Sequence, residues 1–155
     1  MASGHEELVE QLIRLIDIRL LDPLEILVDG HDALDPLRAA VRDRARSWAA
    51  IMIEGDDQAA YGVIVRAIST LYPGDGPFDP PLDWWRSPLG QIVARRVGHP
   101  TAESVSYAVA GAMLGITRQG VHDLASRGKL ARHPQGGVLT AAVRDRLLQE
   151  GTRRA

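Results

Sequence analysis

Four side chains that can hydrogen-bond to nucleic-acid bases recur within one short segment of the chain. They are Arg118, Gln119, His122 and Ser126. Their spacing places them on one face of a helix, with Val121 and Leu124 on the opposite face. Arginine pairs with guanine, and glutamine with adenine, through two hydrogen bonds in the major groove. The segment therefore predicts a helix whose outer side can read base edges, with His122 and Ser126 adding base or phosphate contacts.

Groups suited to bind phosphate flank this segment on both sides. They are Thr117, Arg127, Lys129, Arg132 and Gln135. Contacts from such side chains to the phosphate backbone set the register of a protein on DNA without reading its sequence. Lys129 is the only lysine of the chain, and a flexible ammonium meets a phosphate more readily than it reads a base.

The local sequence also predicts how this segment folds. Tyr107 to Leu114 is a run of small and apolar residues that favours a short helix. Gly115 follows where a turn between two helices often needs a positive φ. Thr117 has the side chain of an N-cap, and Gly128 has the backbone freedom required at the C′ position. A second helix is therefore expected between Thr117 and Gly128.

A glycine-tipped hairpin is expected next, over residues 131–139, and a last helix should begin at Thr140. Apolar residues of that last helix recur at the helical period, so Val143, Leu147 and Leu148 are expected to face inward.

Residues 104–148 resemble the helix-turn-helix domains of the MerR-like and excisionase-like kind. The resemblance is carried by Gly111, Gly115, Ile116, Val121 and Leu124. It implies that the second helix lies in the major groove of double-stranded DNA. It also implies that Arg132 to Val138 form a small wing along the DNA backbone.

Charge is distributed unevenly along the chain. Residues 1–90 contain 8 arginines and 16 acidic residues, a net charge of −8, whereas residues 91–155 contain 10 basic and 4 acidic residues, a net charge of +6. A basic module joined to an acidic one is typical of a DNA-binding domain attached to a body that does not bind DNA.

Composition narrows the class of protein further. With 155 residues, of which 45% are hydrophobic, the chain can bury a proper core, and it contains no cysteine. Disulfides and thiol chemistry are thereby excluded, and a cytoplasmic location is expected. The first residues lack the basic start of a signal peptide, and no apolar run is long enough to span a membrane. The preference for arginine over lysine suggests a GC-rich bacterial genome.

The sequence predicts a mainly α fold in three parts. Residues 1–72 should form a helical bundle that mediates dimerisation, residues 73–86 a Pro- and Gly-rich connection, and residues 87–155 a winged helix-turn-helix domain with one short β-hairpin. Apolar residues over 6–21 form a stripe wider than one packing partner needs, which indicates burial on two sides, either within a bundle or against a second copy of the chain. No membrane partner is expected.

The helices of the first part should start and end at clear signals. Asp35 is expected to cap a helix that continues to Ile53 with Leu37 inward, and Asp56-Asp57 to begin another that reaches Leu71 with Tyr61 inward. Arg38, Arg42 and Arg46 form an outer row that suits a solvated or salt-bridged face. Trp84 and Trp85 suit the pinning of an irregular loop to a core better than the binding of a partner.

Residue patterns for catalysis are not found. The five histidines have no metal-ligand spacing, and Gly74-Asp75-Gly76 lacks the length and the lysine of a phosphate loop. No cofactor is therefore expected, and the sequence gives no positive case for an enzyme.

Two functions from different classes follow. The first is a sequence-specific DNA-binding transcriptional regulator, a repressor that acts as a dimer; an antitoxin that represses its own operon and an excisionase share its features. The second is a protein-interaction adaptor whose helix-turn-helix surface binds an acidic protein.

Overall fold

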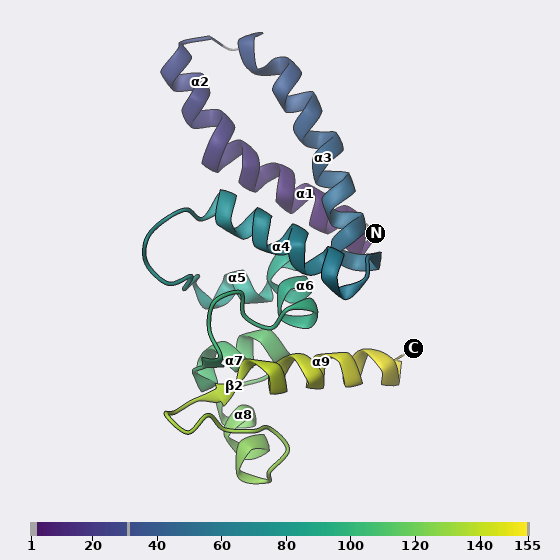
Figure 1. The fold of residues 1–155 in the computed structure, drawn as a ribbon, viewed down its shortest axis with the longest axis vertical. Helices are drawn as coiled ribbons and strands as arrows, with labels where there is room; N and C mark the ends of the chain where they lie inside the picture. Colours follow the sequence, from purple (N-terminus) through teal and green to yellow (C-terminus); the bar gives the residue numbers. More distant parts are fainter. Residues whose placement is uncertain (1–2, 31, 155) are drawn as a thin grey trace. The chain divides into compact units, whose positions relative to one another are not determined.

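The computed structural model describes residues 3–30 and 32–154, and the chain divides into two compact units between Asp75 and Gly76. Both units are mainly helical, and the described residues contain one antiparallel sheet of two short strands (Figure 1). The expectation of a mainly helical fold with a small β element is therefore confirmed. The division between the units falls inside the Pro- and Gly-rich segment 73–86.

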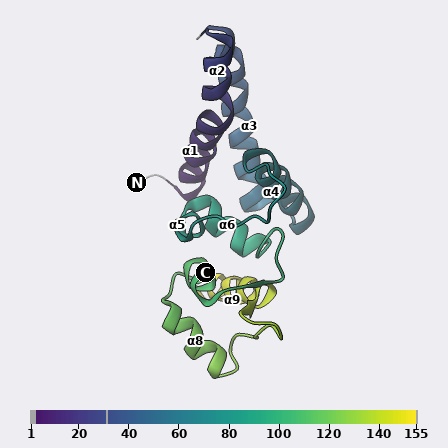
Figure 2. The ribbon, with the colours of Figure 1, turned by 90° about the vertical axis from the view of Figure 1, so that its left-hand side faces the viewer.

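The first unit consists of helices throughout its described residues. They are α1 (Gly4–Ile16), a π-helical turn (Asp17–Leu21), α2 (Asp22–Val28), a 3-10 turn (Asp32–Leu34), α3 (Asp35–Glu54) and α4 (Asp57–Leu71). The run from α1 to α2 lies beside α3 as a hairpin, with α1 packed directly against α3 (Figures 1 and 2). Helix α3 also packs against α4.

The helical path of the first arm continues through Pro23. The π-helical turn joins α1 directly to α2, and Pro23 lies in the first turn of α2. A proline is tolerated there because the N–H groups of a first helical turn need no partner from within that helix. At the other end, the Ser3 hydroxyl accepts from the N–H of Glu6, and the Glu6 carboxylate accepts from the N–H of Ser3 in return.

The core of the first unit is made of aliphatic side chains from α1, α3 and α4. Its fully buried members include Leu8, Leu12, Met52, Ile64 and Leu71. Asp56 caps α4 as expected, because its carboxylate accepts from the N–H of Ala59 at 2.8 Å.

Three expectations in this unit were wrong. Asp35 is not an N-cap: a 3-10 turn precedes α3, and Leu34 occupies the cap position without a side-chain hydrogen bond. Leu37 is 48% exposed and Tyr61 is 53% exposed, although both belong to apolar stripes. Each lies on a side of its helix that is turned away from the helix it packs against, and helical spacing alone does not report which side that is.

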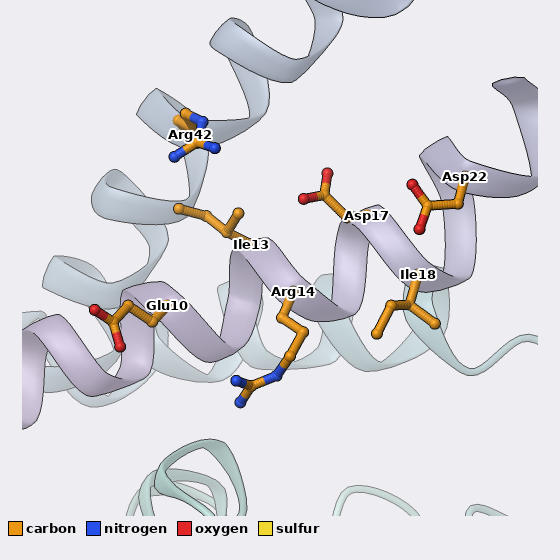
Figure 3. Close-up of a pocket in the computed structure, with 7 residues that line it drawn as sticks. All are labelled: Glu10, Ile13, Arg14, Asp17, Ile18, Asp22 and Arg42. Atoms are coloured by element: carbon orange, nitrogen blue, oxygen red, sulfur yellow. The ribbon is translucent and has the colours of Figure 1, made fainter. Parts of the chain in front are cut away.

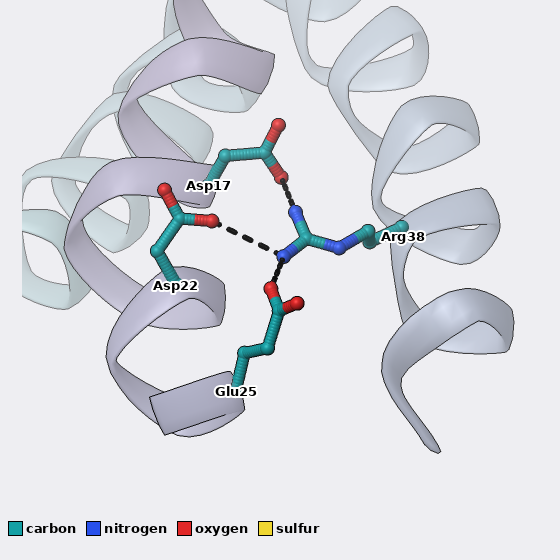
Figure 4. A network of polar contacts seen from close by, with 4 residues as sticks. All are labelled: Asp17, Asp22, Glu25 and Arg38. Atoms are coloured by element: carbon teal, nitrogen blue, oxygen red, sulfur yellow. Dashed lines mark hydrogen bonds and ion pairs between the residues drawn. The ribbon is translucent and has the colours of Figure 1, made fainter. Parts of the chain in front are cut away.

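Arg38 joins the two arms of the hairpin. Its guanidinium donates to Asp17 at 3.0 Å, to Asp22 at 3.1 Å and to Glu25 at 2.6 Å (Figure 4). The hydrogen bond to Asp22 is the largest of the interactions that raise the pKa of Arg38, against the lowering effect of desolvation. Arg46 lies 3.5 Å from Asp43, so ion pairs do form on this arginine row, as expected.

The second unit contains five helices among its described residues and the two strands. They are α5 (Leu82–Arg86), α6 (Pro88–Arg96), β1 (Ser104–Val105), α7 (Tyr107–Leu114), α8 (Arg118–Ser126), β2 (Val138–Leu139) and α9 (Thr140–Arg154). Ser87 caps α6 by accepting from the N–H of Gly90. Helix α5 was not expected within the connection, and Leu148 of α9 is exposed rather than inward.

The two adjacent tryptophans form part of an aromatic cluster. Trp84 and Trp85 are both buried, and Phe78 from the irregular segment packs against them with ring centroids 5.1 and 6.2 Å away. His99 lies 5.3 Å from Trp85, and its Nδ1 accepts from the N–H groups of Thr101 and Ala102. The tryptophans therefore pin an irregular loop, as the sequence indicated.

None of the helices within 3–30 and 32–154 is both long enough and apolar enough to cross a membrane.

Candidate nucleic-acid interface

The turn between α7 and α8 depends on two glycines. Gly115 ends α7 with φ 72°, in the left-handed region where glycine is favoured. A Cβ atom on Gly111 would lie 2.8 Å from the carbonyl oxygen of Ile116, which is closer than side chains tolerate. Gly111 therefore lets the turn lie directly against α7, and the N–H of Ile116 donates to the Gly111 carbonyl at 2.9 Å.

Helix α8 is fixed at both ends by the residues that the sequence singled out. The Thr117 hydroxyl accepts from the N–H of Gly120 at 3.0 Å. At the other end Gly128 has φ 72°, its N–H donates to Ala125, and the N–H of Lys129 donates to Leu124. This pair of hydrogen bonds is a Schellman motif. The orientation of α8 is therefore set by its own end residues.

One side of α8 is anchored in the core of the second unit. Val121 and Ala125 are buried, and Leu124 is half-buried. Val121 and Leu124 were expected to face inward, whereas Ala125 was not noted because a small residue gives a weak hydrophobic signal. The opposite side of the helix is left in solvent.

Residues 131–139 return as a hairpin, but its pairing differs from the expected two-stranded form. Leu139 donates to Ala131, His133 donates to Gly137, and Arg132 and Val138 form an isolated bridge. The strand β2 itself pairs with β1, which was not predicted, so that Val138 lies opposite Val105. The hairpin is thereby attached to the start of α7, and Val138 is fully buried.

All nine predicted contact residues are exposed. They are Thr117, Arg118, Gln119, His122, Ser126, Arg127, Lys129, Arg132 and Gln135. Five belong to α8 or its N-cap, two to the turn that follows it, and two to the hairpin. The structure thus brings residues from three consecutive segments to the surface of one unit.

Several of these side chains contact each other or their neighbours. Arg132 donates to the Ser126 hydroxyl at 3.3 Å, which links the hairpin to the end of α8. Gln119 donates to Asp123 at 3.2 Å. The His122 ring lies 6.0 Å from the ring of Tyr107 on α7. Gln119 and Ser126 are therefore partly pre-positioned before any ligand arrives.

Asp123 is the residue that the sequence reasoning missed. It lies one turn after Gln119 on the exposed side of α8 and holds the Gln119 amide. A carboxylate opposes phosphate, but it can accept a hydrogen bond from the amino group of cytosine in the major groove. Its spacing from Gln119 was visible in the sequence as an i, i+4 pair.

The second unit as a whole is basic. Residues 76–155 carry 11 basic and 6 acidic residues, a net charge of +5, whereas residues 1–75 carry 7 and 14, a net charge of −7. The charge asymmetry therefore follows the division between the units.

Nowhere in the described residues do three or more metal-ligating side chains come together; His31 lies outside those residues. A hollow of about 400 Å³ lies between α1 and α3, and a neighbouring one of about 500 Å³ lies along α2. The first is lined by Glu10, Ile13, Arg14, Asp17, Ile18, Asp22 and Arg42 (Figure 3).

The chain was compared with known proteins at three levels. No protein-family model matches it, and no curated protein or solved structure matches it either.

Proposed function

We propose that the chain is a sequence-specific DNA-binding transcriptional regulator, a repressor in its simplest mode, that acts as a homodimer. In this proposal α7, α8 and the hairpin 131–139 form a winged helix-turn-helix, and α8 enters the major groove. Arg118 and Gln119 read base edges, and the role of the protein is to bind rather than to catalyse.

One observation carries the proposal. The outer side of α8 exposes Arg118, Gln119 and His122, while the helix is held from below by Val121 and at its ends by Thr117 and Gly128. A rigid helix with base-pairing groups on its free face meets the requirement for direct readout, because the groups keep one geometry relative to each other.

The surroundings of α8 support the same function. Arg127 and Lys129 follow the helix directly, and Arg132 is attached to its last turn through Ser126. These cations lie in a unit of net charge +5. Cations next to a reading helix supply the salt-dependent attraction to phosphate that brings a protein to DNA.

A selection experiment tests the proposal. The full chain would be used to enrich a randomised duplex library, and the recovered duplex would be titrated beside a scrambled duplex at several salt concentrations. We expect one sequence to be enriched, with binding to both duplexes that weakens as salt increases. The recovered duplex, placed next to a promoter, should lower expression of a reporter when the protein is present.

Two substitutions should fail in different ways. Arg118→Ala should cost about 1–3 kcal/mol on the recovered duplex and much less on the scrambled one. Lys129→Ala should weaken binding to both duplexes alike and reduce the slope of log affinity against log salt concentration by about one. Arg95→Ala is the matched control, because Arg95 is exposed on α6 in the same unit and should change neither affinity.

The outcome that would overturn the proposal is equally definite. Failure to enrich any sequence, together with equal affinity of wild type and both variants for duplex DNA, excludes α8 as a reading helix. If Arg118→Ala weakens binding to both duplexes equally, Arg118 is a phosphate contact and the hairpin carries the specificity.

A further inference from the structure

Two adjacent hollows lie along one side of the hairpin in the first unit, and Asp22 lines both of them. Ile18 borders the first hollow and is 58% exposed; Ile26 borders the second and is 79% exposed. Arg14 and Ile18 project from the same side of the helix in Figure 3. The side therefore alternates between projecting isoleucines and open hollows.

The same side carries charges that have no ion pair among the described residues. They are Arg14 and Arg42, which line the first hollow, and Asp29, which lines the second. Asp35 is the fourth: it is exposed seven positions before Arg42 on α3, a spacing that places both residues near the same face of the helix. Arg14 and Asp29 lie 15 positions apart, roughly 22 Å along a helix. Asp35 and Arg42 lie 7 positions apart, roughly 10 Å. Neither pair can form within one chain while the helices persist.

We propose that this side of the hairpin binds a second copy of the chain, antiparallel and related by a two-fold axis that passes near Asp22 and Arg38. The axis exchanges positions before Asp22 with positions after it. Ile18 then meets Ile26 of the second copy, and each isoleucine enters the hollow that the other borders. Arg14 of one copy lies beside Asp29 of the other.

The second arm of the hairpin obeys the same axis. Arg38 is held against Asp22 by a 3.1 Å ion pair, so an axis near Asp22 also passes near Arg38 on α3. Asp35 lies three positions before Arg38 and Arg42 four positions after it. The axis therefore pairs Asp35 of one copy with Arg42 of the other. Both arms thus give the same centre independently.

This complementarity identifies the occupant as a second copy. In a two-fold interface each contact occurs twice, so a surface must be complementary to itself. Here each acidic residue has a basic counterpart, and each projecting isoleucine a hollow, at a similar distance on the other side of the proposed axis. Leu24, Leu27 and Val28 are also exposed apolar residues of α2, but the charged pairs and hollows lie on the side of Ile26 instead.

The inference adds a defined surface to the dimer of the proposed function, and it does not need DNA to be tested. The four ion pairs should make the dimer weaker at high salt, because exposed charges are screened. The apolar contacts should keep the dimer detectable at salt concentrations that screen the ion pairs.

Sedimentation equilibrium of the full chain provides the first test, with a matched pair of variants. Ile26 and Leu27 are neighbours on α2 and are both 79% exposed, so the change to glutamate is equivalent for the folding of one chain. Ile26→Glu should raise the dimer Kd on the order of 100-fold, because two isoleucines lose their apolar partner in each dimer. Leu27→Glu should change it by less than about threefold.

Cross-linking tests the arrangement itself. Because the chain has no cysteine, Ile18→Cys with Ile26→Cys introduces the only thiols. Positions eight residues apart are roughly 12 Å apart on a helix, beyond the reach of a disulfide within one chain. Mild oxidation should therefore give a covalent dimer, whereas Ile18→Cys with Leu27→Cys should give little.

Three results would overturn the inference: a wild-type monomer at tens of micromolar, dissociation by Leu27→Glu rather than Ile26→Glu, or equal cross-linking of the two double variants. Circular dichroism of each variant confirms that one chain still folds. A monomer that still selects a DNA sequence would refute this surface and the homodimer, and would leave DNA recognition by α8 intact.

Discussion

Two pairs of helical segments in the molecule are each joined by a short connection: α7 with α8, and the α1–α2 run with α3. The contacts that fix the two pairs differ in kind. In the α7–α8 pair, Gly115 and Gly128 turn the backbone with a positive φ, and Thr117 accepts a hydrogen bond from a backbone N–H three residues away. In the hairpin, the arms are joined by Arg38, which contacts Asp17, Asp22 and Glu25 far back in the chain. Local chemistry sets the first pair, and distant side chains set the second.

The difference has consequences for how each region responds to substitution. A locally fixed helix pair should be sensitive to glycine and cap substitutions and insensitive to salt. The hairpin should tolerate substitutions of its exposed side chains but respond to the loss of its central arginine.

The largest effect should come from Gly137→Ala in the second unit. Gly137 has φ 74°, and an added Cβ would approach the Val105 carbonyl oxygen far below a normal contact distance. We expect a loss of about 3 kcal/mol in the free energy of unfolding, measured by urea denaturation. Gly62→Ala on α4 is the control: nothing lies within 4 Å of its Cβ position, and it should stabilise by up to about 1 kcal/mol. Equal effects would contradict the comparison.

Arg38→Ala should produce the next largest effect, and it should depend on salt. The substitution leaves three carboxylates close together at the centre of the hairpin. Stability should decrease, and added salt should recover part of it by screening the repulsion. Arg46→Ala removes only one exposed pair with Asp43, which contributes about 0–1 kcal/mol. The measurement is thermal unfolding of both variants at two salt concentrations. The same loss of stability and the same salt dependence in both would show that Arg38 does not join the arms.

Loss of a helix cap should have a smaller effect, and the cost should be similar in the two units. Thr117→Ala leaves the N–H of Gly120 without its partner, and Asp56→Ala does the same for Ala59. Each should cost about 1 kcal/mol, while Thr117→Ser should retain most of the stability. Urea midpoints unchanged by both alanine substitutions would mean that water replaces the caps.

The smallest effect should appear only in acid, at His99. Burial lowers the pKa of His99, although a hydrogen bond with the Phe78 backbone and the charge of Asp79 oppose that shift. The unfolded chain therefore takes up a proton near pH 6.5, above the pKa of the folded state. The free energy of unfolding should rise with pH between the pKa of folded His99 and about 6.5, and the contribution of neutral His99 should be lost as the pH falls below about 6.5. His99→Gln should flatten that part of the profile; an unchanged slope would refute the assignment.

The regions fixed by local chemistry are also those that the sequence predicts well. Helix α8 begins and ends as expected because Thr117 and Gly128 act on neighbours three or four residues away, and α7 ends as expected at Gly115. The cap Asp56 was found for the same reason. The exposure of the nine candidate contact residues also followed from helical spacing and polarity.

What the sequence could not give depends on partners far along the chain. Leu37 was placed inward because its spacing fits, but the arm beside it covers another side of α3. The strand at Ser104 was missed because its partner Leu139 lies 35 positions later, in a segment already explained as a hairpin. In the candidate site, Asp123 was not predicted because a carboxylate opposes phosphate, and its contact with Gln119 becomes evident only in the structure.

Lys129 has a chemical consequence that is separate from its charge. It holds the only ε-amine of the chain, and it is exposed directly after α8. Acylation or reductive methylation of the chain therefore modifies a single side chain, at the edge of the candidate interface. Apart from the α-amino group, an amine-reactive fluorophore would label this position alone, so the wild-type chain supplies its own attachment point for a spectroscopic reporter.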